Sequence, residues 1–134
     1  MRKVVRTVDA PRPIGVYSQG IVSNGFVFVS GQGAVNPATN EIEGDDVRSQ
    51  TRQVLRNIRG ILEAAGSSLQ DVVKLGVFLA DIGDFAAMNE VFREFFPEDP
   101  PARTTVSCVL PKPVMKVEID CVARVRTKAG SQRS

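Results

Sequence analysis

Residues 72–80 constrain the fold of this chain more than any other segment, because they are almost continuously apolar. An apolar run of strand length is typical of a central β-strand that is covered on both faces. Residues 116–126 alternate instead between apolar and charged side chains, which predicts a strand with one buried and one polar face. The chain therefore contains at least two strands of a sheet, and other elements have to cover that sheet.

Four further strands are predicted from short β-branched or aromatic runs that are bounded by turn residues. The strongest signal is a hairpin around Asn24-Gly25, a dipeptide that favours a tight two-residue turn. The predicted strands are residues 3–8, 20–23, 26–30 and 103–109. Together with the two segments above, they form a six-stranded sheet.

Two helices are predicted between these strands. The first begins at an N-cap at Asp45 or Asp46 and ends at residue 65, where Gly66 stops it. Its buried face is predicted from apolar residues at three- and four-residue spacing: Val47, Thr51, Val54, Leu55, Ile58, Ile61, Leu62 and Ala65. The second helix covers residues 84–96, with Asp84 as its cap and Pro97 as its stop. Its apolar stripe is expected to be core: Phe85, Met88, Phe92, Phe95 and Phe96.

Two helices against one mixed sheet predict an α/β (α+β) two-layer sandwich with both helices on one face. The other face carries Glu118 and Asp120 among Val and Phe residues, which suggests burial against other subunits in a closed cyclic oligomer. At 134 residues the chain fits one domain over residues 1–126. Residues 127–134 are small and polar, and we expect a disordered tail there.

The chain contains no histidine, and this excludes several classes of chemistry. Ser-His-Asp and Cys-His catalysis both need a histidine base, and nearly all catalytic zinc sites use histidine ligands. The net charge of +2 is too small to indicate nucleic acid as a partner.

Cys108 and Cys121 lie in apolar, strand-like runs without metal-binding spacing, and we expect both to be buried free thiols. Free thiols suit a reducing compartment. The N-terminal residues lack the apolar region of a signal peptide, and no apolar run approaches membrane-spanning length. These features predict a cytoplasmic protein that does not insert into membranes.

Arg103 is a candidate binding residue because of its position at the mouth of a strand. Pro100-Pro101 fix an extended entry, and the β-branched run 104–106 follows. An arginine held there presents a planar fork of donors that suits a carboxylate or a phosphate. Taken alone, this segment favours a solvated strand-end arginine, since most surface arginines have no further role.

Four arginines form a basic stripe on the first helix: Arg48, Arg52, Arg56 and Arg59. Such a stripe could bind RNA phosphates, or it could be an ordinary solvated helix face. The absence of accompanying aromatic residues favours the solvated face.

An ordered set of short motifs runs through the chain and carries a resemblance to a known family. The motifs are Ile14-Gly15-Val16-Tyr17-Ser18-Gln19, Ser30-Gly31-Gln32, Asn57-Ile58, Ala64-Ala65-Gly66, Asp71-Val72-Val73-Lys74, Asp84-Phe85, Asn89, Pro101-Ala102-Arg103 and Val117-Glu118-Ile119. Each motif is weak alone, but the ordered set is specific, and it spans residues 3–126. The chain resembles the Rid family of reactive-intermediate deaminases, the YjgF-type proteins.

The resemblance implies a chorismate-mutase-like fold and a homotrimer whose three sheets close a barrel, with a site in each cleft between subunits. It also implies hydrolysis of 2-imino acids such as 2-iminobutyrate and 2-iminopropionate, or of their enamine tautomers, to 2-keto acids and ammonia. Pyridoxal-phosphate enzymes such as threonine dehydratase release these intermediates, which gives a functional link to those enzymes. Neither a cofactor nor a metal is implied.

Position by position, Arg103 matches the family's carboxylate-binding arginine, and Glu118 matches the acidic residue that orients or activates the attacking water. The substrate-binding positions are matched by Tyr17, Ser30, Gly31, Asn89 and Thr105. Thr105 stands where many relatives have cysteine, and its hydroxyl can still form hydrogen bonds. Gly33 replaces an aliphatic residue, and the spacing within residues 107–116 differs from the family pattern.

These departures leave alternatives open within the resemblance. One is a deaminase of a larger substrate, such as an aminomuconate-type compound. Another is an endoribonuclease or translation inhibitor, for which the arginine stripe is the only local support. The third is a trimer that binds small carboxylates without turning them over.

Overall fold

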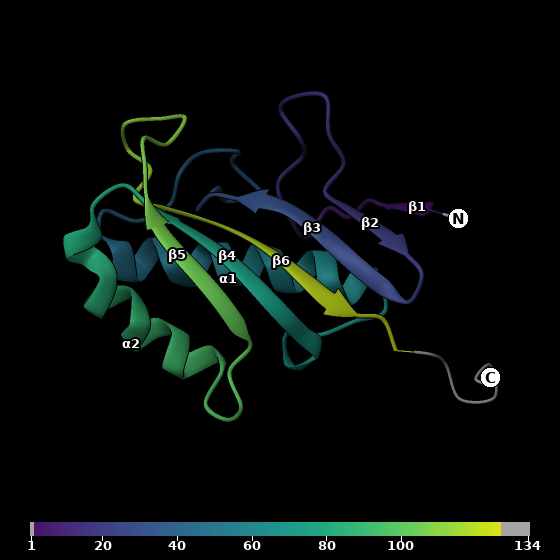
Figure 1. Ribbon diagram of the computed structural model, residues 1–134. Coiled ribbons are helices and arrows are strands. Elements are labelled where there is room, and N and C mark those ends of the chain that lie inside the picture. Colours follow the sequence, from purple (N-terminus) through teal and green to yellow (C-terminus); the bar gives the residue numbers. More distant parts are fainter. Residues whose placement is uncertain (1, 127–134) are drawn as a thin grey trace.

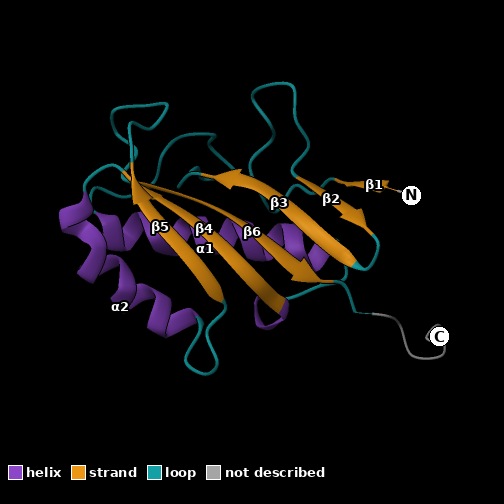
Figure 2. Cartoon of the chain, in the orientation of Figure 1, coloured by secondary structure: helices purple, strands orange, loops and turns teal. Residues whose placement is uncertain are grey.

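The computed structural model describes residues 2–126, and the disordered tail predicted for residues 127–134 lies outside them. One six-stranded sheet forms one layer, and two helices pack on one of its faces (Figures 1 and 2). The helices are α1, Val47–Ala64, and α2, Phe85–Phe95. The strands are β1 Arg2–Val5, β2 Gly20–Ser23, β3 Phe26–Gln32, β4 Val72–Leu79, β5 Ala102–Ser107 and β6 Val117–Arg124. The two-layer sandwich predicted from the sequence is confirmed.

The strand order in the sheet is β1-β2-β3-β6-β4-β5. All neighbouring strands are antiparallel except β4 and β5, which run parallel, so the sheet is mixed as predicted. The helix α2 connects β4 to β5, and such a crossover is what two adjacent parallel strands require. As a result β5 is an edge strand, with one side unpaired within the described chain.

The helix α1 packs its apolar face on the sheet, and its ends agree with the prediction. The Asp46 side chain accepts a hydrogen bond from the Ser49 backbone N–H at 2.9 Å, which caps the first turn. Gly66 adopts a φ of 81°, the left-handed conformation that ends helices and favours glycine. The buried residues of α1 include seven of the predicted ones: Val47, Thr51, Val54, Leu55, Ile58, Ile61 and Leu62.

The predicted cap at Asp84 is wrong in its mechanism. A short 3₁₀ turn over Ile82–Asp84 precedes α2, and the side chain of Asp84 makes no capping hydrogen bond. Asp81 takes that role for the turn, since its carboxylate accepts a hydrogen bond from the Gly83 N–H at 2.8 Å. An aspartate does cap this segment, but it is Asp81 rather than Asp84, because the 3₁₀ turn begins three residues before the helix.

Four predicted strands, β1, β4, β5 and β6, are shorter than expected, and the reasons are clearest for β1. The strand β1 ends at Val5 rather than at residue 8, because the N–H of Thr7 donates to the side-chain oxygen of Gln19 at 2.8 Å instead of to a neighbouring strand. The strand β5 ends at Ser107 rather than at residue 109. Cys108 follows it and is exposed, so the prediction of two buried thiols is correct only for Cys121.

The face of the sheet away from the helices is only partly covered in the single chain. On β4, Leu75, Val77 and Leu79 are buried beneath the helices. The opposite side of β4 carries Gly76 and Phe78, and no helix within residues 2–126 covers it. The sequence predicted that β4 is covered on both faces, and within the described residues helices cover only one of them. Large apolar side chains on the sheet are accordingly exposed, among them Phe26, Phe28, Val73 and Val106. No helix of residues 2–126 combines the length and the apolar character needed to cross a membrane.

Candidate functional site

A β-bulge in β3 shapes the first group of candidate residues. Val29 pairs with Cys121 and Gln32 pairs with Ile119, so Ser30 and Gly31 together lie opposite a single residue of β6. A bulge of this kind bends the strand and redirects the side chains that follow it. Gln32 thereby returns to the buried side of the sheet, while Ser30 and Gly31 stay half-exposed.

Glu118 lies against this bulge, where its side chain covers the backbone of Gly31. A Cβ atom at position 31 would lie 3.1 Å from Cδ and 3.3 Å from Cγ of Glu118, and it would overlap the carboxylate oxygen Oε2. Only glycine leaves room for the carboxylate in this place. Burial, and secondarily the negative charge of Asp120, raise the pKa of Glu118 above its ordinary value.

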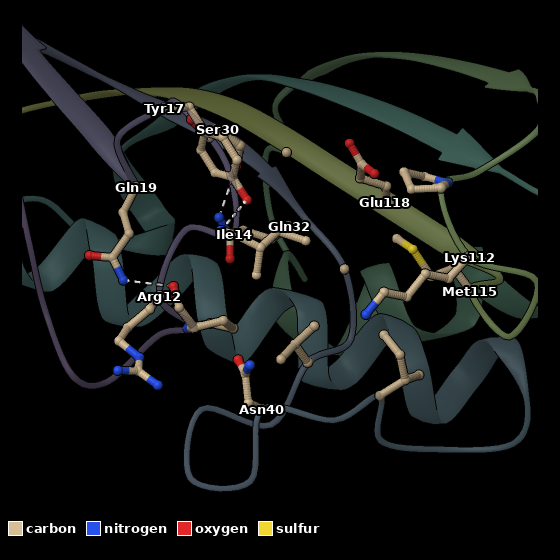
Figure 3. A pocket seen from close by; sticks show the side chains of 16 residues that line it. Arg12, Ile14, Tyr17, Gln19, Ser30, Gln32, Asn40, Lys112, Met115 and Glu118 are labelled. Atoms are coloured by element: carbon tan, nitrogen blue, oxygen red, sulfur yellow. Dashed lines mark hydrogen bonds between the residues drawn. The ribbon is translucent and has the colours of Figure 1, made fainter.

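The Glu118 carboxylate faces a hollow of about 440 Å³, which we call the Glu118 hollow (Figure 3). Its wall includes Tyr17, Ser30 and Gly31, which are three of the predicted substrate-binding residues. The Ser30 hydroxyl donates to the Ser18 carbonyl at 2.6 Å, and this bond ties the loop that carries Tyr17 to β3. The structure thus brings four of the seven predicted site residues together.

Residues that the sequence analysis did not select also shape this hollow. Gln19 is buried, and its amide donates to the carbonyl of Pro11 at 2.9 Å, which holds the preceding loop against the hollow. Arg12, Lys112 and Met115 line the wall as well. Arg12 and Lys112 each have a proline on both sides, which fixes the neighbouring backbone. These prolines were the sequence signal that could have indicated two rigid segments here.

Arg103 belongs to a second group of residues, on the edge strand β5 beside α2. Its Nη1 donates to the side-chain oxygen of Asn89 at 2.7 Å. Its guanidinium carbon lies 5.4 Å from the ring centroid of Phe85 and 5.0 Å from that of Phe92, within cation–π distance of both. Phe85, predicted as core, is in fact partly exposed and serves as a platform for the guanidinium.

Arg103 keeps donors available for a ligand. Among residues 2–126 it forms no salt bridge, and one amide oxygen satisfies only one of the five N–H groups of the guanidinium. Partial burial lowers its pKa from the ordinary value, although an arginine remains charged at physiological pH. An unpaired, partly desolvated guanidinium at the mouth of a concave surface is well suited to bind an anion.

Thr105 lies on the same side of β5 as Arg103, because the two residues are separated by one position in a strand. Its hydroxyl oxygen is buried and has no hydrogen-bond partner within the described part of the chain. A buried hydroxyl without a partner is unfavourable, and a substrate or a second chain could supply the missing bond.

The seven candidate residues therefore fall into two groups that one chain does not join. Arg103 and Thr105 pair with Leu75 and Val77, so they point to the helix side of the sheet. Glu118 alternates with the buried residues of β6 and points to the open side. The first group is Arg103, Asn89 and Thr105, and the second is Tyr17, Ser30, Gly31 and Glu118.

The arginine stripe of α1 is less free than the sequence suggested. Arg48 forms a two-pronged pair with Glu90, at 2.9 and 3.1 Å, and Arg52 forms one with Glu94, at 2.7 and 3.0 Å. Both glutamates come from α2, so these pairs join the two helices. Arg48 and Arg52 have no acidic residue at four-residue spacing, but partners 42 residues away neutralise this half of the stripe.

The described residues offer no group of three His, Cys, Asp or Glu side chains that could hold a metal ion.

Comparison with known proteins places this chain among relatives along almost its whole length. The family model described as Endoribonuclease L-PSP matches residues 7–125. A RutC family protein of Pyrococcus horikoshii is 52% identical over 124 residues, which cover 92% of this chain and 98% of the relative. The Escherichia coli K12 protein named "Putative reactive intermediate deaminase TdcF" is 45% identical over 127 residues, which cover 92% of this chain and 97% of that protein.

Solved structures agree with this placement. RidA from an Antarctic Psychrobacter species superposes with a TM-score of 0.88 at 41% identity, covering 92% of this chain and 99% of that one. The yjgF gene product of E. coli superposes with a TM-score of 0.86 at 41% identity, with the same coverage. The chain has the chorismate-mutase-like fold of these proteins, and it belongs to the Rid/YjgF/RutC family.

Proposed function

We propose that this protein hydrolyses small 2-imino acids, and their 2-enamine tautomers, to 2-keto acids and ammonia in a cleft between two copies of the chain. The observation that carries the proposal is the division of the site into two complementary groups. One group offers a free guanidinium on an edge strand, and the other offers a carboxylate with a raised pKa beside a hollow. A second copy that packs against the open face could bring Arg103 next to Glu118, and we infer a closed homotrimer.

In this proposal Arg103 binds the carboxylate of the imino acid. A two-pronged arginine–carboxylate pair fixes the position and the orientation of the substrate, and it rejects analogues that lack the acid group. Asn89 and the two phenyl rings hold the guanidinium plane in place. The unpartnered hydroxyl of Thr105 donates a hydrogen bond to the bound substrate.

Glu118 carries the proton transfers. The protonated C=N carbon is already electrophilic, and the Glu118 carboxylate removes a proton from a water molecule as that water attacks the carbon. The resulting carbinolamine takes the proton from Glu118 onto its nitrogen. The regenerated carboxylate then accepts the hydroxyl proton as the C–N bond breaks, which forms the keto group and releases ammonia, and Glu118 finally gives this proton to the ammonia or to solvent. A raised pKa suits a group that both accepts and returns a proton near neutral pH.

The first test is an imine-trapping assay. Threonine dehydratase generates 2-iminobutyrate in situ, and semicarbazide traps whatever imine remains. The wild-type protein should suppress semicarbazone formation, and Arg103→Ala should lose the effect. The control is Arg56→Ala, which removes an exposed arginine of α1 that belongs to neither group of site residues. Equal suppression by wild type and Arg103→Ala would contradict the proposed role of the arginine.

The shared cleft can be tested by mixing subunits. Arg103→Ala and Glu118→Gln should each be inactive alone. Oligomers that contain both variants should regain some clefts in which one copy supplies an intact Arg103 and the other supplies an intact Glu118. Random mixing of equal amounts should restore about a quarter of the clefts, as the symmetry of a closed ring requires. Mixed oligomers without activity, or light scattering that shows a monomer, would contradict a site built from two copies.

The remaining alternatives receive less support. An RNA-directed role would rely on an arginine stripe in which Arg48 and Arg52 are already paired with glutamates. A trimer that binds carboxylates without turnover would retain Arg103-dependent binding of 2-keto acids and show no effect of Glu118→Gln on trapping. The trapping assay with Glu118→Gln separates that case from catalysis.

A further inference from the structure

Two cationic side chains stand on the wall of the Glu118 hollow, and neither is neutralised. Arg12 and Lys112 line the hollow, and Glu118 is the only acidic residue among its lining residues. Within residues 2–126 neither cation forms a salt bridge. The two lie at different sides of the hollow, and Lys112 extends its amino group toward the middle (Figure 3). The wall therefore offers positive charge that the hydrolysis of a monocarboxylic imino acid does not require.

The backbone that carries Lys112 is held in place. Prolines at positions 111 and 113 flank the residue and fix their own φ angles. The Gln50 side chain, 1% exposed, bridges the same loop to α1: its Nε2 donates to the Val114 carbonyl at 2.9 Å, and its Oε1 accepts from the Lys116 N–H at 2.8 Å. The Met115 N–H donates to the Lys112 carbonyl at 3.0 Å. The backbone position of Lys112 is therefore fixed, and its ammonium group extends from a defined point on the wall of the hollow.

The hollow is also larger than the smallest substrates need. Its volume of about 440 Å³ lies in the range of pockets that accept ligands well beyond the size of a four-carbon acid. Gly33 contributes to this space, because a Cβ there would come within 2.8 Å of the terminal methyl of Met115 and push that side chain aside. A substrate side chain longer than ethyl therefore has room, and its far end can reach the cationic wall.

We propose that the preferred substrates are 2-imino acids whose side chain ends in a second carboxylate, and that Lys112 binds this carboxylate while Arg103 of a second copy binds the first. The proposal rests on the deaminase function above and assigns Lys112 as its specificity-determining residue. A charged hydrogen bond to the far carboxylate should favour dicarboxylates by about tenfold over uncharged substrates of similar length.

The binding of product analogues tests this without turnover. Isothermal titration measures the affinity for 2-ketoglutarate and for 2-ketohexanoate, which has a similar length and an uncharged end. The variants are Lys112→Met, Arg103→Ala and the control Lys3→Met, which removes an exposed lysine of β1 outside the hollow. Wild type and Lys3→Met should prefer 2-ketoglutarate by about tenfold, Lys112→Met should abolish that preference, and added salt should narrow it.

The possible results separate the two proposals. Equal affinities in the wild type, or a preference that survives Lys112→Met, would overturn the role of Lys112; if binding still depends on Arg103, the deaminase proposal stands. No binding of either keto acid, or binding that Arg103→Ala leaves unchanged, would contradict both proposals. Circular dichroism of Lys112→Met checks that the exposed substitution leaves the fold intact.

Discussion

Replacing Gly31 with alanine should abolish the proposed deaminase activity without unfolding the protein. The new methyl group would occupy the space of the Glu118 carboxylate, so the carboxylate has to move by about 1 Å or more, and a displacement of that size can cost about 100-fold in rate. Stability should not suffer, because Gly31 does not have a positive φ. A glycine-to-alanine change at a compatible backbone conformation stabilises proteins by about 0.4 to 1 kcal/mol through the unfolded state, which offsets the local crowding.

Gly25→Ala is the matched control with the opposite expectation. Gly25 has a φ of 85° and open space around its Cα, so alanine there is strained by about 1 to 2 kcal/mol but touches nothing of the site. The trapping assay and thermal unfolding should therefore give a crossed pattern: Gly31→Ala loses activity and keeps its melting temperature, while Gly25→Ala keeps activity and melts earlier. Wild-type activity in Gly31→Ala would refute the role assigned to the carboxylate in its observed position.

Three further predictions follow from single interactions. Because the pKa of Glu118 is raised in the folded state, the native protein holds a proton that the unfolded chain releases, so the wild type should lose stability relative to Glu118→Gln as the pH rises from about 4 to 7. Urea unfolding at about pH 4 and about pH 7 measures this, and a stability difference between Glu118→Gln and wild type that grows toward acid would contradict it. Asn57→Ala should lower the free energy of unfolding in urea by about 2 to 4 kcal/mol, because the buried Asn57 amide donates to two backbone carbonyls that would lose their partner. The control Gln53→Ala removes one part-buried hydrogen bond and should lower it far less. Single-stranded RNA should bind weakly, and equally to wild type and to the Arg52→Ala/Arg56→Ala double variant, in a filter-binding assay; a clear loss of binding in the variant would restore the RNA interpretation.

The sequence predicted the layers of this fold because most of its signals are local. The 3.6-residue spacing of α1, its cap at Asp46 and the two-residue hairpin turn at Asn24-Gly25 each depend on residues close in sequence. The errors arose where an unexpected side-chain bond or an unexpected turn changed the outcome. Gln19 ends β1 early through its bond to Thr7, and a 3₁₀ turn displaces the cap expected at Asp84.

The sequence proposed seven site residues, of which four line one hollow, but it did not predict how the seven are arranged. The family resemblance supplied Arg103 and Glu118, yet it did not show that they point to opposite faces of the sheet. That separation depends on how β4, β5 and β6 pair, which no local pattern determines. The neutralisation of Arg48 and Arg52 escaped prediction for the same reason, because their partners lie 42 residues away on another helix.

The bulge in β3 has a consequence for how this site can vary. Two adjacent residues, Ser30 and Gly31, share one position of the ladder, and Gln32 is buried as a result. Deleting either residue would leave Gln32 two positions after Val29 and still facing inward, but it would remove the bulge. The deletion would also remove either the hydroxyl that ties the Tyr17 loop to β3 or the glycine beneath the Glu118 carboxylate. We expect relatives to differ in the side chains around the hollow while keeping the number of residues between Val29 and Gln32 constant. In this segment both the number of residues and the glycine beneath Glu118 are therefore constrained.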